Sequence, residues 1–260
     1  MYPSSRRPLS LLWSFIQREL RFRFAGSLLG SVWTILGPLL LLGIFSVVFS
    51  QLFTQRSDLG TENYTFYVAL GLWPWMMFSD GLLRGMMAIQ TNASIVKKIA
   101  FPHVLLVIAA VTSVFLQHLG GFVVVMLIFV ATGTGNISVA GVPLAVLYLA
   151  LLFVFTIGLS LLLASLQIFL RDIEQAAVPA IMMLHYLTPV LYPPSLIPAS
   201  YRWLLECNPL ALFVMRFRDC LLIGPSIQIA DSHLLFATVL LLALGTTVFA
   251  RLSPHFEDFL

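Results

Sequence analysis

Charged residues are scarce in this chain. Only 10% of its 260 residues are Asp, Glu, Lys or Arg, whereas 60% are hydrophobic and the mean hydropathy is +0.98. A soluble domain carries about 25% charged residues. A chain with so little charge cannot cover its surface in water, so the composition excludes an ordinary soluble domain. It predicts a protein that crosses a membrane several times.

The sequence also lacks the motifs of several enzyme classes. It contains no G-x-x-x-x-G-K-[ST] phosphate-binding loop, and the Gly-rich stretch 133–141 follows no strand. Its five histidines have no metal-ligand spacing. Its two cysteines, Cys207 and Cys220, lie in apolar surroundings that favour burial over a disulfide. We therefore predict no catalytic residue, metal or cofactor in this chain, no nucleic-acid partner, and no ATP hydrolysis by the chain itself.

Six apolar stretches have about the length of a transmembrane helix, which is ~20 mostly apolar residues. They are roughly 31–53, 65–88, 104–131, 142–170, 176–193 and 232–252. They do not alternate between apolar and polar residues as membrane barrel strands do. The pattern predicts an all-α polytopic membrane protein with one transmembrane domain over residues 1–260. The fifth stretch is the weakest because it is short and contains Pro179 and Pro189.

Basic residues are unequally distributed between the two sides of this topology. Nine lie before the first span, after the second and fourth, or at the C-terminal end, while four lie in the opposite loops, with Arg84 inside the second span left out. Lys and Arg accumulate on the cytoplasmic side of membrane proteins. The distribution predicts that both termini are cytoplasmic.

Residues 9–24 are amphipathic. Leu9, Trp13, Ile16 and Leu20 recur at helical spacing, and a basic face lies opposite them. A basic amphipathic helix with aromatic residues on its apolar side lies in the membrane interface. Its basic face either serves only the orientation rule or also contacts a cytoplasmic partner.

Ionisable residues inside the spans are costly in a bilayer. Asp80 and Arg84 are four residues apart on one helix face, so they either neutralise each other or serve a substrate path or gate. His118 and His185 stand alone in the third and fifth spans and predict hydrogen-bonded packing.

The segment after the fifth span is interrupted too often to cross a membrane. YPPSLIP at 192–198 is followed by a predicted short helix over 195–206, a break at Asn208 and Pro209, and a second helix over 210–223. Segments of this length are re-entrant or interfacial rather than spanning. We interpret 195–223 as two re-entrant helices on the periplasmic side, with an ordinary periplasmic loop as the alternative.

These re-entrant helices would form a gate at the exit of a path, since broken backbone at membrane depth is tolerated where it lines a cavity. The candidate gate residues are Tyr192, Pro193, Asn208, Pro209, Arg216 and Arg218.

Several short motifs, in this order and spacing, resemble one known family across essentially the whole chain. They are RELRFRFAGSLLGSVW (18–33), NASIVKKIAFP (92–102), Arg171–Asp172, Tyr192–Pro193, and Asn208–Pro209–Leu210 leading to Arg218. They resemble the membrane subunit of type-2 ABC exporters of bacterial cell-surface polysaccharides: O-antigen, capsule or teichoic acid. The resemblance implies a homodimeric permease in the bacterial inner membrane, joined to two copies of a separate ATPase that binds ATP and Mg²⁺.

The resemblance further implies that 92–102 is a coupling helix that docks on the ATPase. Its physical chemistry agrees: Asn92 or Ser94 can cap the helix, and Pro102 stops it. The predicted helix runs from Ile95 to Phe101. The candidate coupling residues are Asn92, Ser94, Ile95, Lys97, Lys98, Ile99 and Phe101, with Arg18 and Arg21 of the N-terminal helix. The alternative is a basic cytoplasmic loop without docking.

The implied substrate is a polysaccharide on undecaprenyl diphosphate, passed between two permease copies. Basic residues at the cytoplasmic entrance would meet its phosphates, and aromatic residues would meet its sugars or form the interfacial belt. The candidate path residues are Arg21, Arg23, Trp33, Tyr64, Phe66, Tyr67, Trp73, Trp75, Asp80 and Arg84, with Lys97 at the entrance.

Two other classes stay open at this point. A membrane enzyme of lipid-linked sugar synthesis needs clustered carboxylates at a membrane face, and only RDIE at 171–174 offers any. A secondary carrier often shows internal repeats, and none is evident in the sequence.

Overall fold

The computed structural model describes residues 8–22, 26, 30–50, 63–99 and 101–260. Within these ranges the secondary structure is helical, without a strand, as predicted. The longer helices are α1 (Pro8–Phe22), α2 (Trp33–Ser50), α3 (Tyr64–Thr91), α5 (Val104–Ala131), α6 (Val142–Gln167), α7 (Asp172–Leu187), α9 (Pro209–Leu222) and α10 (Ala230–Leu252). The short ones are α4 (Ala93–Val96), α8 (Trp203–Glu206) and α11 (Phe256–Phe259), accompanied by 3₁₀ turns.

Three helical segments in the described part of the chain are long and apolar enough to cross a membrane. They are Val104–Ala131, Val139–Gln167 and Asp231–Phe259, and Ile35–Val48 within α2 is a shorter apolar helix. These segments agree with the predicted polytopic helical membrane protein.

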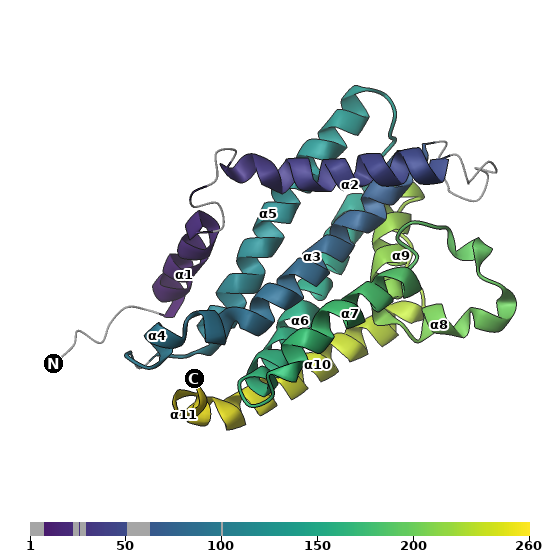
Figure 1. Cartoon of the computed structure of the whole chain (residues 1–260). Coiled ribbons are helices and arrows are strands. Elements are labelled where there is room, and N and C mark those ends of the chain that lie inside the picture. The colour runs from purple at the N-terminus through teal and green to yellow at the C-terminus, as the bar shows by residue number, and fades with distance from the viewer. Residues whose placement is uncertain (1–7, 23–25, 27–29, 51–62, 100) are drawn as a thin grey trace.

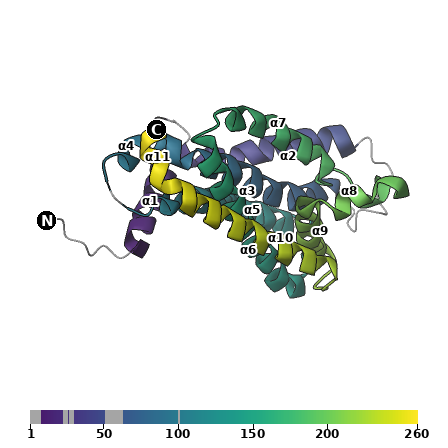
Figure 2. The ribbon, with the colours of Figure 1, turned by 90° about the horizontal axis from the view of Figure 1, so that it is seen from below.

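The helices form an elongated bundle (Figure 1). α1, α4 and α11 gather at one end, which we call the α4 end, and α8 lies toward the other, which we call the α8 end. α3 packs against α5 and α6 in the middle of the bundle. Figure 2 shows α2 and α7 on one side of α3, with α6 and α10 on the opposite side.

Small residues let α6 and α10 approach closely. A Cβ atom on Gly245 would lie 2.1 Å from the carbonyl oxygen of Gly158, and one on Gly158 would lie 2.7 Å from the backbone nitrogen of Leu242. Membrane helices associate through such small-residue contacts because lipid offers no hydrophobic driving force between them. The α6–α10 pair is therefore fixed by backbone packing.

The predicted fifth span, 176–193, has the wrong boundaries. α7 runs from Asp172 to Leu187, and its early start agrees with the acidic residues of its first turn, which favour a helix N-terminus. It ends at Leu187 because Thr188 precedes Pro189 and adopts extended backbone, with φ −100° and ψ 130°.

The first predicted re-entrant helix, 195–206, is also wrong. The segment forms 3₁₀ turns at Pro194–Leu196 and Ala199–Tyr201 and then only α8, because Pro198 interrupts the run. The second helix is confirmed as α9. The Asn208 side chain accepts a hydrogen bond of 3.0 Å from the Leu210 backbone N–H and caps it.

Candidate functional site

The α4 end is held together by one apolar cluster. Phe15 and Ile16 of α1 pack with Val96 of α4, with the first turns of α5, and with Phe256 of α11. Phe101 extends this cluster, and its ring lies 5.4 Å from that of Phe15. The N-terminal helix, the predicted coupling segment and the C-terminal turn therefore form one packed unit.

The predicted coupling helix is shorter than expected and lies earlier in the chain. α4 covers Ala93–Val96, and Lys97 and Lys98 form a turn after it instead of continuing a helix to Phe101. Neither Asn92 nor Ser94 caps α4 with its side chain. The predicted cap is wrong because the Asn92 side chain is bonded elsewhere.

The turn presents a mixed surface. Lys97 and Lys98 are exposed, and Ile99 is 58% exposed although it is apolar. Phe101 is partly buried and packs against the apolar cluster. The longest exposed run of the coupling segment is therefore Lys97 to Ile99, and Ser94 of α4 is exposed as well.

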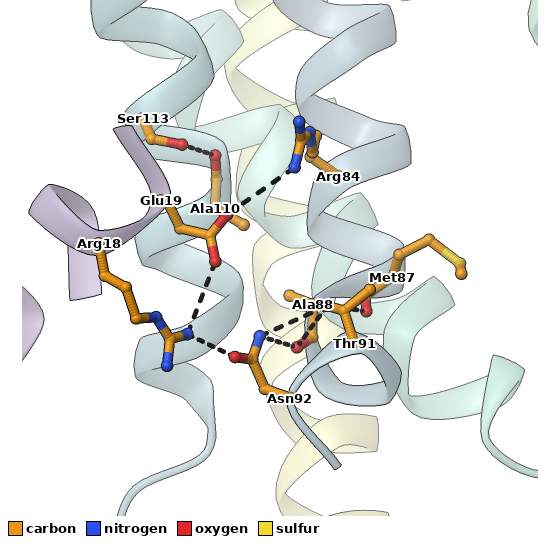
Figure 3. Close-up of polar contacts among 9 residues, drawn as sticks. All are labelled: Arg18, Glu19, Arg84, Met87, Ala88, Thr91, Asn92, Ala110 and Ser113. Carbon is orange, nitrogen blue, oxygen red and sulfur yellow. Dashed lines mark hydrogen bonds and ion pairs between the residues drawn. The ribbon is translucent and has the colours of Figure 1, made fainter. Parts of the chain in front are cut away.

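Asn92 ties α1 to the junction of α3 and α4 (Figure 3). Its side-chain oxygen accepts a hydrogen bond from the Arg18 guanidinium, and its amide donates to the Ala88 carbonyl over 2.8 Å. Arg18 thus forms a contact within the chain, between α1 and the residue before α4. Arg21 is exposed at the end of α1, and Arg23 lies outside the described residues.

The predicted mutual neutralisation of Asp80 and Arg84 is replaced by two separate contacts. Oδ2 of Asp80 lies 2.9 Å from Nε2 of His118, which confirms hydrogen-bonded packing for that histidine. Arg84 faces Glu19 of α1, with 3.9 Å between Nη1 and Oε2 (Figure 3). Asp80 and Arg84 of α3 are thus each contacted by a side chain of another helix, His118 of α5 and Glu19 of α1.

The aromatic residues predicted along the substrate path are mostly core residues. Tyr64, Phe66, Tyr67 and Trp73 are buried within the chain, which corrects both the sugar-contact and the interfacial-belt interpretation. The Trp73 indole donates to the His118 carbonyl over 3.0 Å. Trp33 is half-exposed at the start of α2.

Trp75 differs from these because it lines a cavity of about 330 Å³ between α2, α3 and α7. Ser79, Asp80, His185 and Tyr186 line the same cavity. Its wall combines aromatic rings with a carboxylate and a hydroxyl. The rings of such a wall can stack on the C–H faces of a sugar, and its oxygen atoms can accept hydrogen bonds from the sugar hydroxyl groups.

Arg218 fastens the break after α7 to α3. Its guanidinium is fully buried and donates to the Tyr67 hydroxyl over 2.6 Å, and to the carbonyls of Pro189 and Val190 over 2.9 and 2.8 Å. Gly71 leaves the space for it, since a Cβ there would lie 1.9 Å from Nη2.

Arg216, on the same helix α9, performs a comparable role toward α10. It forms a bidentate ion pair with Asp231 at 2.8 and 3.1 Å and contacts the Ser226 carbonyl. Both predicted gate arginines therefore hold backbone segments in place. Tyr192 is half-buried and Pro193 buried, and the Tyr192 hydroxyl donates to the Tyr186 carbonyl over 2.9 Å.

His103 stands just before α5, outside the apolar helices. Its ring lies 5.2 Å from that of Phe101 and 6.2 Å from that of Phe256. Burial lowers the pKa of His103 below its usual value, and the nearby carboxylate of Glu257 partly offsets this.

Comparison with known proteins shows which protein family the chain belongs to. Residues 10–222 match a family described as ABC-2 type transporter. The chain belongs to the ABC-2 type transporter family. It is 30% identical over 252 residues to the O-antigen export system permease protein RfbA of Klebsiella pneumoniae, which covers 96% of this chain and 95% of that protein.

Two further relatives cover most of this ABC-2 chain. The RfbA protein of Myxococcus xanthus is 29% identical over 212 residues, 80% of this chain and 78% of its own length. The polysialic acid transport protein KpsM of Escherichia coli is 24% identical over 237 residues, 89% of each protein. The chain is thus a multi-pass permease subunit that works with an ATPase subunit. It is a transporter component rather than an enzyme, and the predicted family is confirmed.

Sequence reasoning about this ABC-2 permease missed several residues that join helices. Glu19, Gly71 and Gln167 were not singled out. The Gln167 amide donates to Gln90 of α3 over 2.9 Å and to Glu174 of α7 over 3.3 Å. The one available signal was that Glu19 is the first acidic residue of the chain, set among basic neighbours.

Proposed function

We propose that this ABC-2 permease moves a lipid-linked polysaccharide, O-antigen on undecaprenyl diphosphate, across the bacterial cytoplasmic membrane. The observation that carries the proposal is the similarity to RfbA of Klebsiella pneumoniae over 96% of this chain. The weaker similarity to KpsM favours a second candidate, export of a capsule-type polymer by the same mechanism.

The proposed topology has six spans, formed by α2, α3, α5, α6, α7 and α10, with both termini in the cytoplasm. The nine-to-four distribution of basic residues supports this orientation. So does the common position of α1, α4 and the C-terminus at one end of the bundle (Figure 1). Reporter fusions at 136 and 260 test it, and a cytoplasmic signal at 136 or a periplasmic one at 260 would refute it.

The proposed assembly is a homodimer of this chain with two copies of a separate ATPase that binds ATP and Mg²⁺. α4 and the exposed turn Lys97–Ile99 would dock on the ATPase. This turn is supported by its exposed isoleucine beside two lysines, since an apolar contact with a charged rim is a common interface pattern.

The proposed path passes the cavity of Trp75, Asp80 and His185, whose aromatic and polar wall suits sugar rings. Arg21 and Lys97, both exposed at the α4 end, stand at the proposed entrance. The 3₁₀ turns, α8 and α9 would cover the periplasmic exit. Cysteine labelling with an impermeant reagent should reach positions near 200 and 224 from outside.

Complementation tests the function. A strain lacking its O-antigen permease should regain surface O-antigen when this chain is expressed with the ATPase encoded beside it. A strain that lacks a capsule permease tests the second candidate, because expression of this chain should then restore surface capsule. If neither polymer reaches the surface while the two subunits form a complex, the polysaccharide proposal is wrong.

A further inference from the structure

Arg18, Glu19 and Arg84 form a cluster with one more positive than negative charge. Arg18 lies 3.6 Å and Arg84 3.9 Å from the Glu19 carboxylate (Figure 3). Charge-assisted Arg–carboxylate hydrogen bonds are about 2.7–2.9 Å long. One carboxylate is therefore shared loosely by two guanidinium groups, and it satisfies neither with a direct hydrogen bond.

The two arginines are committed to different degrees. Arg18 donates a hydrogen bond to Asn92 and lies over the Phe15 ring, 5.1 Å from its centroid. Arg84 has the longer ion pair of the two and is the more exposed, with 46% of its side chain accessible against 24% for Arg18. Arg84 is thus the residue that can change partner without breaking a hydrogen bond of the described structure.

Arg84 lies about two turns before the end of α3, at the end of the helix that the proposed topology places at the cytoplasmic face. It precedes Thr91, the last residue of α3, by seven positions, which is about 10 Å along a helix. The headgroup region occupies about 5–8 Å on each side of the hydrocarbon core. A long arginine side chain near a helix end can reach that region, and a guanidinium group binds phosphate oxygens in a bidentate manner.

Glu19 belongs to the helix that holds the coupling segment. Its neighbour Arg18 connects α1 to Asn92, the residue immediately before α4. The Glu19–Arg84 contact ties the same helix to the last third of α3. A change of partner at Arg84 therefore alters how α1 is held while the α1–α4 connection stays intact.

We propose that Arg84 binds the phosphate of a lipid headgroup, specifically the diphosphate of the lipid-linked substrate, and that Glu19 competes for Arg84 until that lipid arrives. Binding displaces Glu19, breaks the Glu19–Arg84 contact between α1 and α3, and passes the change to α4 through Arg18 and Asn92. This inference rests on the proposed function, because the diphosphate is that of the exported lipid.

The test uses the full chain purified with its ATPase in phosphatidylcholine nanodiscs and measures binding of radiolabelled farnesyl diphosphate. Arg84→Gln should weaken binding about tenfold or more, because a hydrogen-bonded charge is lost. Glu19→Gln should tighten binding about three- to fivefold, since the lost competitor is a partly exposed ion pair. Misfolding would not produce this gain.

Matched controls come from exposed charges at the same end of the bundle, the α4 end. Arg251→Gln and Glu257→Gln carry the same changes of charge away from the cluster and should stay within about twofold of the wild type. If they shift binding as far as the cluster variants do, or if Arg84→Gln and Glu19→Gln leave it unchanged, the proposal is overturned.

A second arm separates the two sources of phosphate. Phosphatidylglycerol at the same mole fraction should compete poorly with farnesyl diphosphate, and equal competition would overturn the assignment to the substrate. Glu19→Gln should also raise the basal ATPase rate of the complex at least twofold, toward the rate of the diphosphate-stimulated wild type. An unchanged basal rate would overturn the switch.

If the wild-type protein captures its ATPase and binds farnesyl diphosphate, and if Arg84→Gln and Glu19→Gln bind it equally well, only the role of Arg84 and Glu19 is refuted. If the wild-type complex binds no diphosphate lipid at all, the proposed substrate class fails with it.

Discussion

Replacing Gly71 by alanine would displace the buried guanidinium of Arg218. The new Cβ would lie 1.9 Å from Nη2, 2.9 Å from Cζ and 3.1 Å from the carbonyl oxygen of Val190. A Cβ atom essentially never lies within about 3 Å of another non-bonded heavy atom in a folded protein, so one group has to move. Arg218 has no route to solvent because its side chain is fully buried, so it has to give up hydrogen bonds.

The size of the effect follows from the partners that Arg218 holds. Its three hydrogen bonds go to the Tyr67 hydroxyl and to two backbone carbonyls of the break after α7. A hydrogen bond to a charged group contributes about 1.5–3 kcal/mol. Loss of two of them lowers the free energy of unfolding by about 3–6 kcal/mol, which corresponds to a fall in unfolding temperature of the order of 10 °C.

The assay is thermal unfolding of the purified permease, with Gly120→Ala of α5 as the matched control. A Cβ at Gly120 meets no atom within 4 Å, so this variant should equal the wild type or exceed it slightly through better helix propensity. If the Gly71 variant is as stable as the Gly120 variant, Arg218 does not hold the break after α7 as described.

Three further substitutions follow from local geometry. Gly245→Ala should separate α6 from α10 by its clash with the Gly158 carbonyl and reduce the yield of folded protein, and a yield equal to that of Gly120→Ala would contradict the close packing. Because its folded-state pKa is lowered, His103 stabilises the fold fully above pH ~6.5, and this contribution is lost as the pH falls from there toward the folded pKa. His103→Gln should therefore flatten the fall in unfolding temperature between pH 7.5 and 5.5, and an unchanged slope would contradict it. Asn208→Ala should remove the cap of α9 and cost about 1 kcal/mol in thermal unfolding, whereas no loss would mean that Pro209 alone sets the start of the helix.

The sequence predicted the helices better than their partners. Apolar runs located α5, α6 and α10 because long uncharged stretches have few alternatives in a membrane protein. The predicted helix ends were less accurate where the effect of a proline on the preceding residue was not taken into account. Thr188 before Pro189 already favours extended backbone, and the predicted span nevertheless continued to 193.

Charge pairing could not be predicted from spacing. Asp80 and Arg84 share a helix face, and the structure still gives them His118 and Glu19 as partners from other helices. A spacing argument sees only contacts within a helix, whereas the arrangement of α1 against α3 depends on packing over the whole bundle. The same limit applies to Trp73, whose burial is decided by the neighbours α5 and α9 rather than by its own segment.

Capture of the ATPase by an Ile99→Asp variant tests the coupling account most directly. Ile99 is 58% exposed, so the change should leave the permease folded and in the membrane. A carboxylate placed in an apolar contact without a partner costs more than the about 1–3 kcal/mol of an unpaired neutral polar group, so co-purified ATPase should fall about tenfold or more, together with export. Ile227→Asp, at an 83% exposed position far from α4, should retain both. Normal ATPase capture and export by the Ile99 variant would contradict the account and leave Lys97 and Lys98 as orientation signals only.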